Sequence, residues 1–268
     1  MPELPEVETV VRHLKPDLVG QKILSFQSIW PKVLGNVHNK YFNDVIVGRN
    51  ILDVNRRAKF IVLHLDNGFI PIHLRMTGRL YTNDNIPTAK HISAVFRLSD
   101  KMLIFQDTRK FGRVYWYDQW AEFDQKHGVE PLGELFTKNW LQQSLQGRKR
   151  QVKALLLDQH IIAGLGNIYV DEALWSARIH PLISSNNISS VKSNRLHESI
   201  KVILEQAIAY NGTTFINFTF QDGVPGSYRN QLQVFDRKGL PCKRCETVIK
   251  KIKAAGRGTY FCPRCQKI

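Results

Sequence analysis

The spacing of the four cysteines is the feature that most constrains this chain. They form the pattern Cys242-x2-Cys245-x16-Cys262-x2-Cys265. Each C-x2-C pair can offer two thiolates from one tight turn, and two such pairs complete a tetrahedral Zn²⁺ site. Four protein ligands leave no open coordination position, so the motif predicts one structural zinc ion with a small finger around it.

The segment between the two cysteine pairs has the pattern of a β-hairpin. Residues 248–253 alternate into Ala255-Gly256-Arg257-Gly258, and 259–261 follow, which predicts a bend that presents a glycine-flanked Arg257. Residues 236–268 hold ten Lys and Arg against two acidic residues, so they contribute +8 of the chain's net charge of +15. This excess favours a polyanionic partner such as nucleic acid, although a merely soluble basic protein remains an alternative.

Two hydrophobic patterns divide the rest of the chain. Apolar residues at helical spacing over 4–18, followed by Gly20, predict an N-terminal helix. Between 21 and 117, short β-like runs separated by turn signals predict a β-sandwich or barrel. These runs are 22–26, 59–65, 69–74, 94–98, 102–106 and 114–117. A linker is expected over 119–137, a long loop over 211–230, and helices over 140–145, 151–158, 168–177 and 191–209.

These patterns predict an α+β protein with an N-terminal helix and β-sandwich, a helical domain and a C-terminal zinc finger. We place the three parts at 1–130, 131–235 and 236–268. The sequence contains no apolar run of the length that spans a bilayer and no signal-peptide pattern, so a cytoplasmic protein is expected.

Pro2 gives the N-terminus a distinctive chemistry. Loss of Met1 would leave a secondary amine whose pKa, like that of other α-amines, is about 7.7–8, so part of it is neutral at cellular pH. Condensation of this amine with an aldehyde gives an iminium cation, the electron sink that elimination at a deoxyribose needs. Glu3 and Glu6 could supply acid–base steps. Alternatively, proline and glutamate here simply mark the start of a helix.

Six motifs, in the same order along the whole chain, resemble those of formamidopyrimidine-DNA glycosylases. They are Pro2-Glu3-Leu4-Pro5-Glu6-Val7-Glu8-Thr9, Arg56-Arg57-Ala58-Lys59-Phe60, His73-Leu74-Arg75-Met76-Thr77-Gly78, Asp107-Thr108-Arg109-Lys110-Phe111-Gly112, Gly164-Leu165-Gly166-Asn167-Ile168-Tyr169-Val170-Asp171-Glu172, and Asn230-Gln231-Leu232-Gln233-Val234-Phe235 followed by the cysteine motif with Gly256-Arg257-Gly258-Thr259. The fifth is similar to the family's helix–two-turn–helix element, which the resemblance places in the helical domain.

The resemblance implies a bifunctional DNA glycosylase and abasic-site lyase. Such an enzyme removes 8-oxoguanine and formamidopyrimidines and then cleaves the strand by β,δ-elimination. By analogy, Pro2 is the Schiff-base nucleophile and Glu3 an acid–base group beside it. Lys59 would donate a proton during β-elimination, and Arg257 would bind a flanking phosphate and assist δ-elimination.

The implied partner is double-stranded DNA that contains oxidised bases. The target nucleotide must leave the stack, and Met76, Arg109 and Phe111 match the family residues that fill the vacancy. An isolated Met or Phe would more often pack in a core, but the loop context favours exposure. Further DNA contacts are expected at His91, Lys149, Lys153 and Asn167, the last at a helix N-terminus.

Two segments depart from the family pattern. Ile92 and Ser93 follow His91 where a second acid and histidine are expected, and the lesion-capping loop near 223–228 is divergent. Two alternatives remain: an endonuclease VIII-like glycosylase for oxidised pyrimidines, and a non-catalytic damaged-DNA-binding protein on the same scaffold. The Leu4-Pro5-Glu6 continuation favours the purine branch. Nothing indicates oligomerisation, and a monomer is expected.

Overall fold

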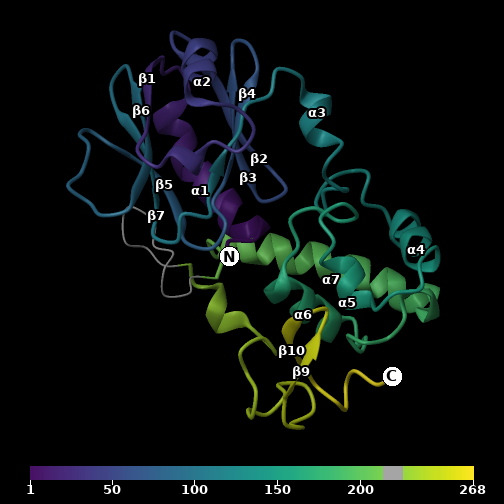
Figure 1. Cartoon of the computed structure of the whole chain (residues 1–268). Helices are drawn as coiled ribbons and strands as arrows, with labels where there is room; N and C mark the ends of the chain where they lie inside the picture. The colour runs from purple at the N-terminus through teal and green to yellow at the C-terminus, as the bar shows by residue number, and fades with distance from the viewer. Residues whose placement is uncertain (214–225) are drawn as a thin grey trace. The chain divides into compact units, whose positions relative to one another are not determined.

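The computed structural model describes residues 1–213 and 226–268, and the chain divides into two compact units (Figure 1). Unit 1 comprises Met1–Lys126 with Asn211–Gly226, and unit 2 comprises His127–Tyr210 with Ser227–Ile268. The expected lesion-capping loop near 223–228 lies partly outside the described residues. No helix among the described residues is long and apolar enough to cross a membrane.

Unit 1 consists of helix α1 (Leu4–Leu18) and two antiparallel four-stranded sheets. The first has the order β1–β6–β7–β5, with strands Ile23–Ser28, Ile92–Leu98, Met102–Asp107 and Gly78–Asn83. The second has the order β2–β3–β4–β8, with strands Ile51–Arg57, Phe60–Leu65, Phe69–His73 and Arg113–Val114. Short helices η1 (Pro31–Val33), α2 (Asn39–Ile46) and α3 (Trp120–Asp124) complete the unit.

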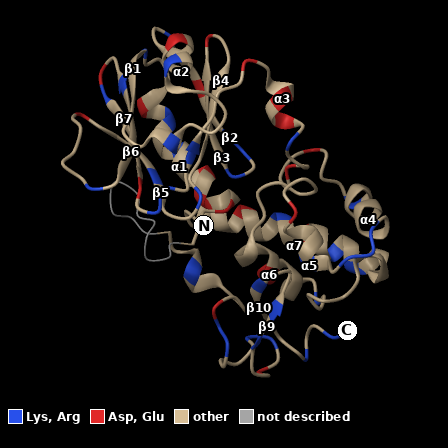
Figure 2. Cartoon of the chain, viewed as in Figure 1, with Lys and Arg blue, Asp and Glu red and all other residues tan. Residues whose placement is uncertain are grey.

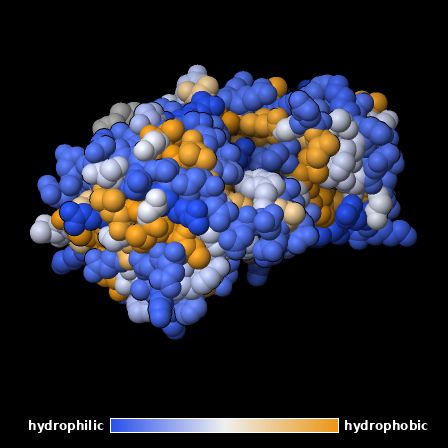
Figure 3. Space-filling view, turned by 90° about the horizontal axis from the view of Figure 1, so that it is seen from above, coloured by the Kyte–Doolittle hydropathy of each residue, from blue (hydrophilic) through white to orange (hydrophobic). Residues whose placement is uncertain are grey.

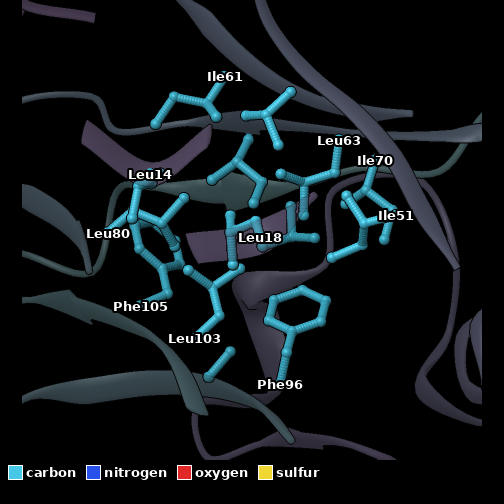
Figure 4. Packing of buried hydrophobic residues seen from close by; sticks show 14 of the residues in the cluster. Leu14, Leu18, Ile51, Ile61, Leu63, Ile70, Leu80, Phe96, Leu103 and Phe105 are labelled. Carbon is cyan, nitrogen blue, oxygen red and sulfur yellow. The ribbon is translucent and has the colours of Figure 1, made fainter. Parts of the chain in front are cut away.

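Helix α1 shares one hydrophobic core with both sheets. Leu14 and Leu18 lie four residues apart, so they occupy the same face of the helix. Figure 4 shows them packed among side chains of both sheets, namely Ile51, Ile61, Leu63 and Ile70 on one side and Leu80, Phe96, Leu103 and Phe105 on the other. This burial fixes the helix, and with it the N-terminal residues that precede it.

The linker expected over 119–137 is wrong in its first part, where α3 forms. Its Phe123 is buried against an aromatic group on the second sheet, with ring centroids 5.8 Å from Phe69 and 5.5 Å from Tyr117. The Nε of Arg57, beside the Lys59 turn, lies 2.6 Å from Asp124 Oδ1. These distant partners stabilise a five-residue helix that its own sequence pattern does not indicate.

Unit 2 holds helices α4 (Lys138–Gln146), α5 (Val152–Leu156), α6 (Asn167–Ser176) and α7 (Ser190–Ala209), with 3-10 turns η2 (Ser185–Asn187) and η3 (Tyr228–Gln231). Ser189 and Thr137 cap α7 and α4 by accepting backbone N–H bonds. Residues 168–175 of α6 are all buried, so this helix lies at the centre of the unit. The fold therefore confirms the predicted α+β class with a finger at its C-terminal end.

The finger contains the hairpin β9 (Lys250–Ala254) and β10 (Arg257–Phe261). Ala255 and Gly256 have φ values of 50° and 71°, as a two-residue hairpin turn requires. Arg257 was predicted at the bend, but it is the first residue of β10 and pairs with Ala254. Figure 2 shows Lys and Arg on this hairpin, and in Figure 3 hydrophilic residues cover most of the viewed face, with smaller hydrophobic patches among them.

Candidate functional site

The N-terminal residues are held in place rather than trailing into solvent. Pro2 and Glu3 are buried, whereas Met1 is 43% exposed. Glu3 is the N-cap of α1, and its backbone N–H donates to Glu6 Oε2 at 2.8 Å in a capping box. Glu6 Oε1 accepts from the backbone N–H and hydroxyl of Thr213 at 2.8 and 3.0 Å. Since each carboxylate oxygen of Glu6 accepts a backbone N–H group, we interpret Glu6 as a positioning residue and keep Glu3 as the acid–base candidate.

Lys59 lies in the tight turn between β2 and β3, where Arg57 pairs with Phe60. Its side chain is buried, and Ala58 before it has a φ of 55°. Arg56 links this turn to α1, because its Nε lies 3.1 Å from Glu8 Oε2 and its Nη1 donates to Ala58 O at 3.1 Å. The turn that carries Lys59 is therefore anchored to the helix that begins beside Pro2.

The three residues predicted to fill the DNA vacancy come together on two neighbouring loops of unit 1. Met76 and Phe111 are 47% and 50% exposed, which excludes the core-packing alternative for both. The Arg109 guanidinium lies 4.8 Å from the Phe111 ring centroid, and its Nη1 is 3.6 Å from Met76 Sδ. A sulfur, a cation and an aromatic ring thus form one exposed cluster, which we call the wedge.

A buried carboxylate, Asp107, organises the wedge. Its Oδ2 accepts the backbone N–H groups of Phe111 and Gly112 at 2.8 and 2.7 Å. Its Oδ1 accepts the Arg109 N–H at 3.1 Å and the Thr77 hydroxyl at 2.5 Å. Because Thr77 belongs to the loop of Met76, this single side chain joins both wedge loops.

The remaining expected DNA contacts have different environments. His91 in unit 1 is exposed at a φ of 68°, and its carbonyl accepts the Asp107 N–H at 2.9 Å. In unit 2, Lys149 is exposed, and Asn167 begins α6. The Asn167 Nδ2 donates to Gly258 O at 2.9 Å, directly beside the exposed Arg257. A hydrogen bond therefore joins the start of α6 to the hairpin residue that follows Arg257.

Lys153 is buried, whereas a phosphate contact requires a side chain that DNA can reach. Its side chain is 0% exposed, and the ammonium lies 2.6 Å from Asp171 Oδ1 and 2.7 Å from Thr259 Oγ1. Burial raises the pKa of Asp171 to about 7, against the opposing effect of Lys153. In this arrangement the ammonium is enclosed by protein, so we reinterpret Lys153 as a residue that positions α6 and β10.

The four cysteines fit one zinc ion. Their Sγ atoms all lie within 4.8 Å of one another, with separations of 3.4 Å for Cys245–Cys262 and Cys245–Cys265 and 4.0 Å for Cys242–Cys265. Tetrahedral zinc with Zn–S bonds of about 2.3 Å places sulfurs about 3.8 Å apart. All four cysteines are free of disulfides. The predicted structural zinc site is confirmed as a four-thiolate cluster.

Three family models match the chain in succession. Residues 1–114 match the formamidopyrimidine-DNA glycosylase N-terminal domain, 127–219 the H2TH domain of the same enzymes, and 239–268 a zinc finger found in FPG and IleRS. A formamidopyrimidine-DNA glycosylase of Chloroflexus aurantiacus is 44% identical over 99% of this chain and 98% of its own length. One of Pelotomaculum thermopropionicum is 43% identical over 100% of both chains.

Solved structures show the same architecture. The Lactococcus lactis Fpg in complex with DNA containing an abasic site is 37% identical, with a TM-score of 0.92 over 99% of this chain and 100% of that one. MutM in complex with DNA containing carbocyclic 8-oxo-G is 38% identical, with a TM-score of 0.91 over 100% of both chains. Fold and site thus define a DNA glycosylase with an H2TH domain and a zinc finger. The chain belongs to the formamidopyrimidine-DNA glycosylase family, which confirms the resemblance seen in its motifs.

Sequence reasoning missed the acidic residues that position these groups. Asp107 lies in the fourth family motif, but its sequence context does not indicate its role. Glu172 is fully buried in α6 and accepts backbone N–H groups of Gln233, Val234 and Phe235 at 2.8–2.9 Å. The available signal for Glu172 was an adjacent pair of carboxylates in a largely apolar helix, because such groups need donors when they are buried.

Proposed function

We propose that this chain is a bifunctional DNA glycosylase and abasic-site lyase that removes oxidised purines, 8-oxoguanine and formamidopyrimidines, from double-stranded DNA. The proposal assigns Pro2 as nucleophile, Glu3 and Lys59 as acid–base groups, and Arg257 as a phosphate ligand. His91, Lys149 and Asn167 are proposed DNA contacts. The family membership supports this proposal, and the local geometry of each unit is consistent with it.

The observation that carries the proposal is the buried, capped N-terminus. Chain termini are usually poorly ordered unless something ties them down. Here the capping box and the core of α1 hold Pro2 in place, while Met1 before it is 43% exposed. A reactive amine needs such a fixed position, because catalysis depends on holding the nucleophile at a set distance from its target.

The chemistry follows from the secondary amine. The Pro2 nitrogen attacks the sugar C1′, the C1′–N bond to the base breaks, and the base leaves with a proton supplied by an acid group. The Pro2 nitrogen then gives up its proton, the C1′–O4′ bond breaks and O4′ takes up a proton, which opens the sugar ring and leaves an iminium ion. This ion acidifies the C2′ proton, and the loss of that proton expels the 3′ phosphate. A second proton loss, at C4′, expels the 5′ phosphate. Glu3 and Lys59 are the groups we assign to these proton transfers, which need positioned acids and bases.

The wedge supplies the step before chemistry. A base inside a duplex is out of reach of any nucleophile, so the damaged nucleotide must rotate out of the stack. Met76 and Phe111 offer apolar surfaces for the vacated space, and Arg109 offers donors to the orphaned base. Their mutual contacts and shared anchor at Asp107 support insertion as one unit.

Borohydride trapping tests the nucleophile. The chain with Pro2 at its N-terminus should form a covalent adduct with 8-oxoguanine duplex after reduction, and mass spectrometry should locate the adduct on Pro2. Pro2→Gly should lower strand cleavage at least tenfold. Pro16→Ala, at an exposed proline of the same helix, is the matched control and should behave as the unaltered chain.

Three outcomes would contradict the proposal in different ways. An adduct on a lysine would refute Pro2 as nucleophile. Binding without any adduct would favour the non-catalytic DNA-binding alternative. Faster excision of oxidised pyrimidines than of 8-oxoguanine or formamidopyrimidines, measured on matched duplexes, would favour the endonuclease VIII-like specificity.

A further inference from the structure

One face of helix α6 contacts the finger along its length. Asn167 donates to Gly258 O at 2.9 Å, Asp171 Oδ2 accepts the Tyr260 N–H at 2.9 Å, and the Trp175 Nε1–H donates to Cys242 Sγ at 3.4 Å. The three α6 residues are four positions apart, so they lie on the same side of the helix. This side therefore reaches from the hairpin beside Arg257 to the cysteine cluster.

Trp175 is the member of this series that touches the metal site. Its side chain is buried in a cluster that also contains Cys242, Cys262 and Tyr260. The indole N–H can only donate, and a thiolate is an acceptor that zinc ligation leaves electron-rich. Because Zn²⁺ neutralises only two of the four thiolate charges, a donor at Cys242 stabilises the charge that remains.

Arg244 contacts both the ring and the backbone carbonyl of Trp175. It lies between the first two cysteines, and its guanidinium carbon is 3.9 Å from the centroid of the Trp175 ring. Its Nη1 also donates to the Trp175 carbonyl at 3.1 Å. A cation stacked on an indole face attracts its electrons, which makes the ring N–H a stronger donor. The same contact brings positive charge close to an anionic metal site.

We propose that Trp175 and Arg244 form a retention pair for the finger's zinc ion. Trp175 donates its indole hydrogen bond to the Cys242 thiolate, and Arg244 fixes the indole in place. Groups that hydrogen-bond to metal ligands affect metal affinity by about 10–100-fold. The pair is independent of the nucleophile, so zinc retention and Schiff-base chemistry can fail separately.

The test measures zinc loss from the full-length, zinc-loaded protein to a chromogenic chelator. Trp175→Phe keeps an aromatic ring under Arg244 but removes the N–H donor, and it should release zinc about tenfold more readily. Trp140→Phe is the matched control, because Trp140 lies in α4, outside the finger. Its ring centroid is 5.7 Å from that of Phe136, which precedes the helix. Arg244→Met should fall between the unaltered chain and Trp175→Phe.

The outcomes separate clearly. The proposal would be overturned if Trp175→Phe released zinc no faster than the Trp140→Phe control, whether or not the control itself releases zinc faster than the unaltered chain. If Trp175→Phe does not fold, the unaltered protein provides the second measurement. On replacing zinc with cadmium, one of the chain's five tryptophan indole N–H resonances should shift. Five unchanged indole resonances would refute the hydrogen bond.

Discussion

Replacement of Asp107 probes how the wedge is built. In Asp107→Asn, an amide oxygen at the Oδ2 position can still accept the N–H groups of Phe111 and Gly112. The amide NH₂ at the Oδ1 position then faces the N–H of Arg109, which loses its carboxylate acceptor and keeps only Thr77 Oγ1 at 3.2 Å. It also faces the hydroxyl of Thr77, which can rotate to accept. The substitution should therefore loosen the Arg109 end of the wedge selectively.

The magnitude follows from the number and burial of the bonds. Loss of one hydrogen bond to a charged group costs about 1.5–3 kcal/mol, so Asp107→Asn should lower the free energy of unfolding by about that amount. In Asp107→Ala all four bonds are lost, and the buried Gly112 N–H keeps no acceptor. Since the N–H groups of Arg109 and Phe111 are only partly buried and can be rehydrated, we expect a total of about 3–5 kcal/mol.

Two assays check this reasoning. Denaturant unfolding measures the stability of the variants, with Thr77→Ser as the control that keeps the hydroxyl. A fluorescent 2-aminopurine opposite the lesion reports insertion of the wedge, and its signal should fall in Asp107→Asn even at saturating protein. If Asp107→Asn unfolds within about 0.5 kcal/mol of the unaltered chain, a range typical of neutral surface changes, and the fluorescence is unchanged, the carboxylate does not organise the wedge.

Three further predictions concern residues around the site. Lys153→Met should destabilise the protein by about 3–5 kcal/mol, because it leaves Asp171 buried without its cation. The double variant Lys153→Met/Asp171→Leu should recover only part of the loss in denaturant unfolding, because the Tyr260 N–H then loses its Asp171 acceptor. Gly112→Ala should cost about 1–3 kcal/mol by overpacking, since the new Cβ would lie 2.4 Å from the ring of the buried Phe105; a crystal structure with an unmoved Phe105 would contradict this. Burial lowers the pKa of His180 below 6.5, so the unfolded chain takes up this proton first on acidification. The free energy of unfolding is therefore unaffected by this histidine above pH 6.5 and decreases as the pH falls below that value. In His180→Gln the melting temperature should depend less steeply on pH between about 7 and 5, and an equally steep profile would refute this.

Several features were determined by the sequence alone, because their physics is local. The x2 spacing within each cysteine pair places two thiolates in one turn, so the zinc site could be predicted without any tertiary contact. The helix over 4–18 was correct at both ends, because its apolar spacing and its acidic start act within a few turns. The motifs also indicated the family, since each of them lies in one short segment.

Other features depended on residues that are distant in the chain. The enclosure of Lys153 requires Thr259, 106 positions away, and the five-residue helix α3 is stabilised by aromatic neighbours such as Phe69 rather than by its own periodicity. Asp107 joins two loops only because packing brings Thr77, 30 positions away, to its carboxylate, and Trp175 meets the Cys242 thiol across 67 positions of chain. Local sequence patterns thus identified the chemical groups of the site. Only the packing of the two cores decided which of these groups face solvent and which are buried and position the others.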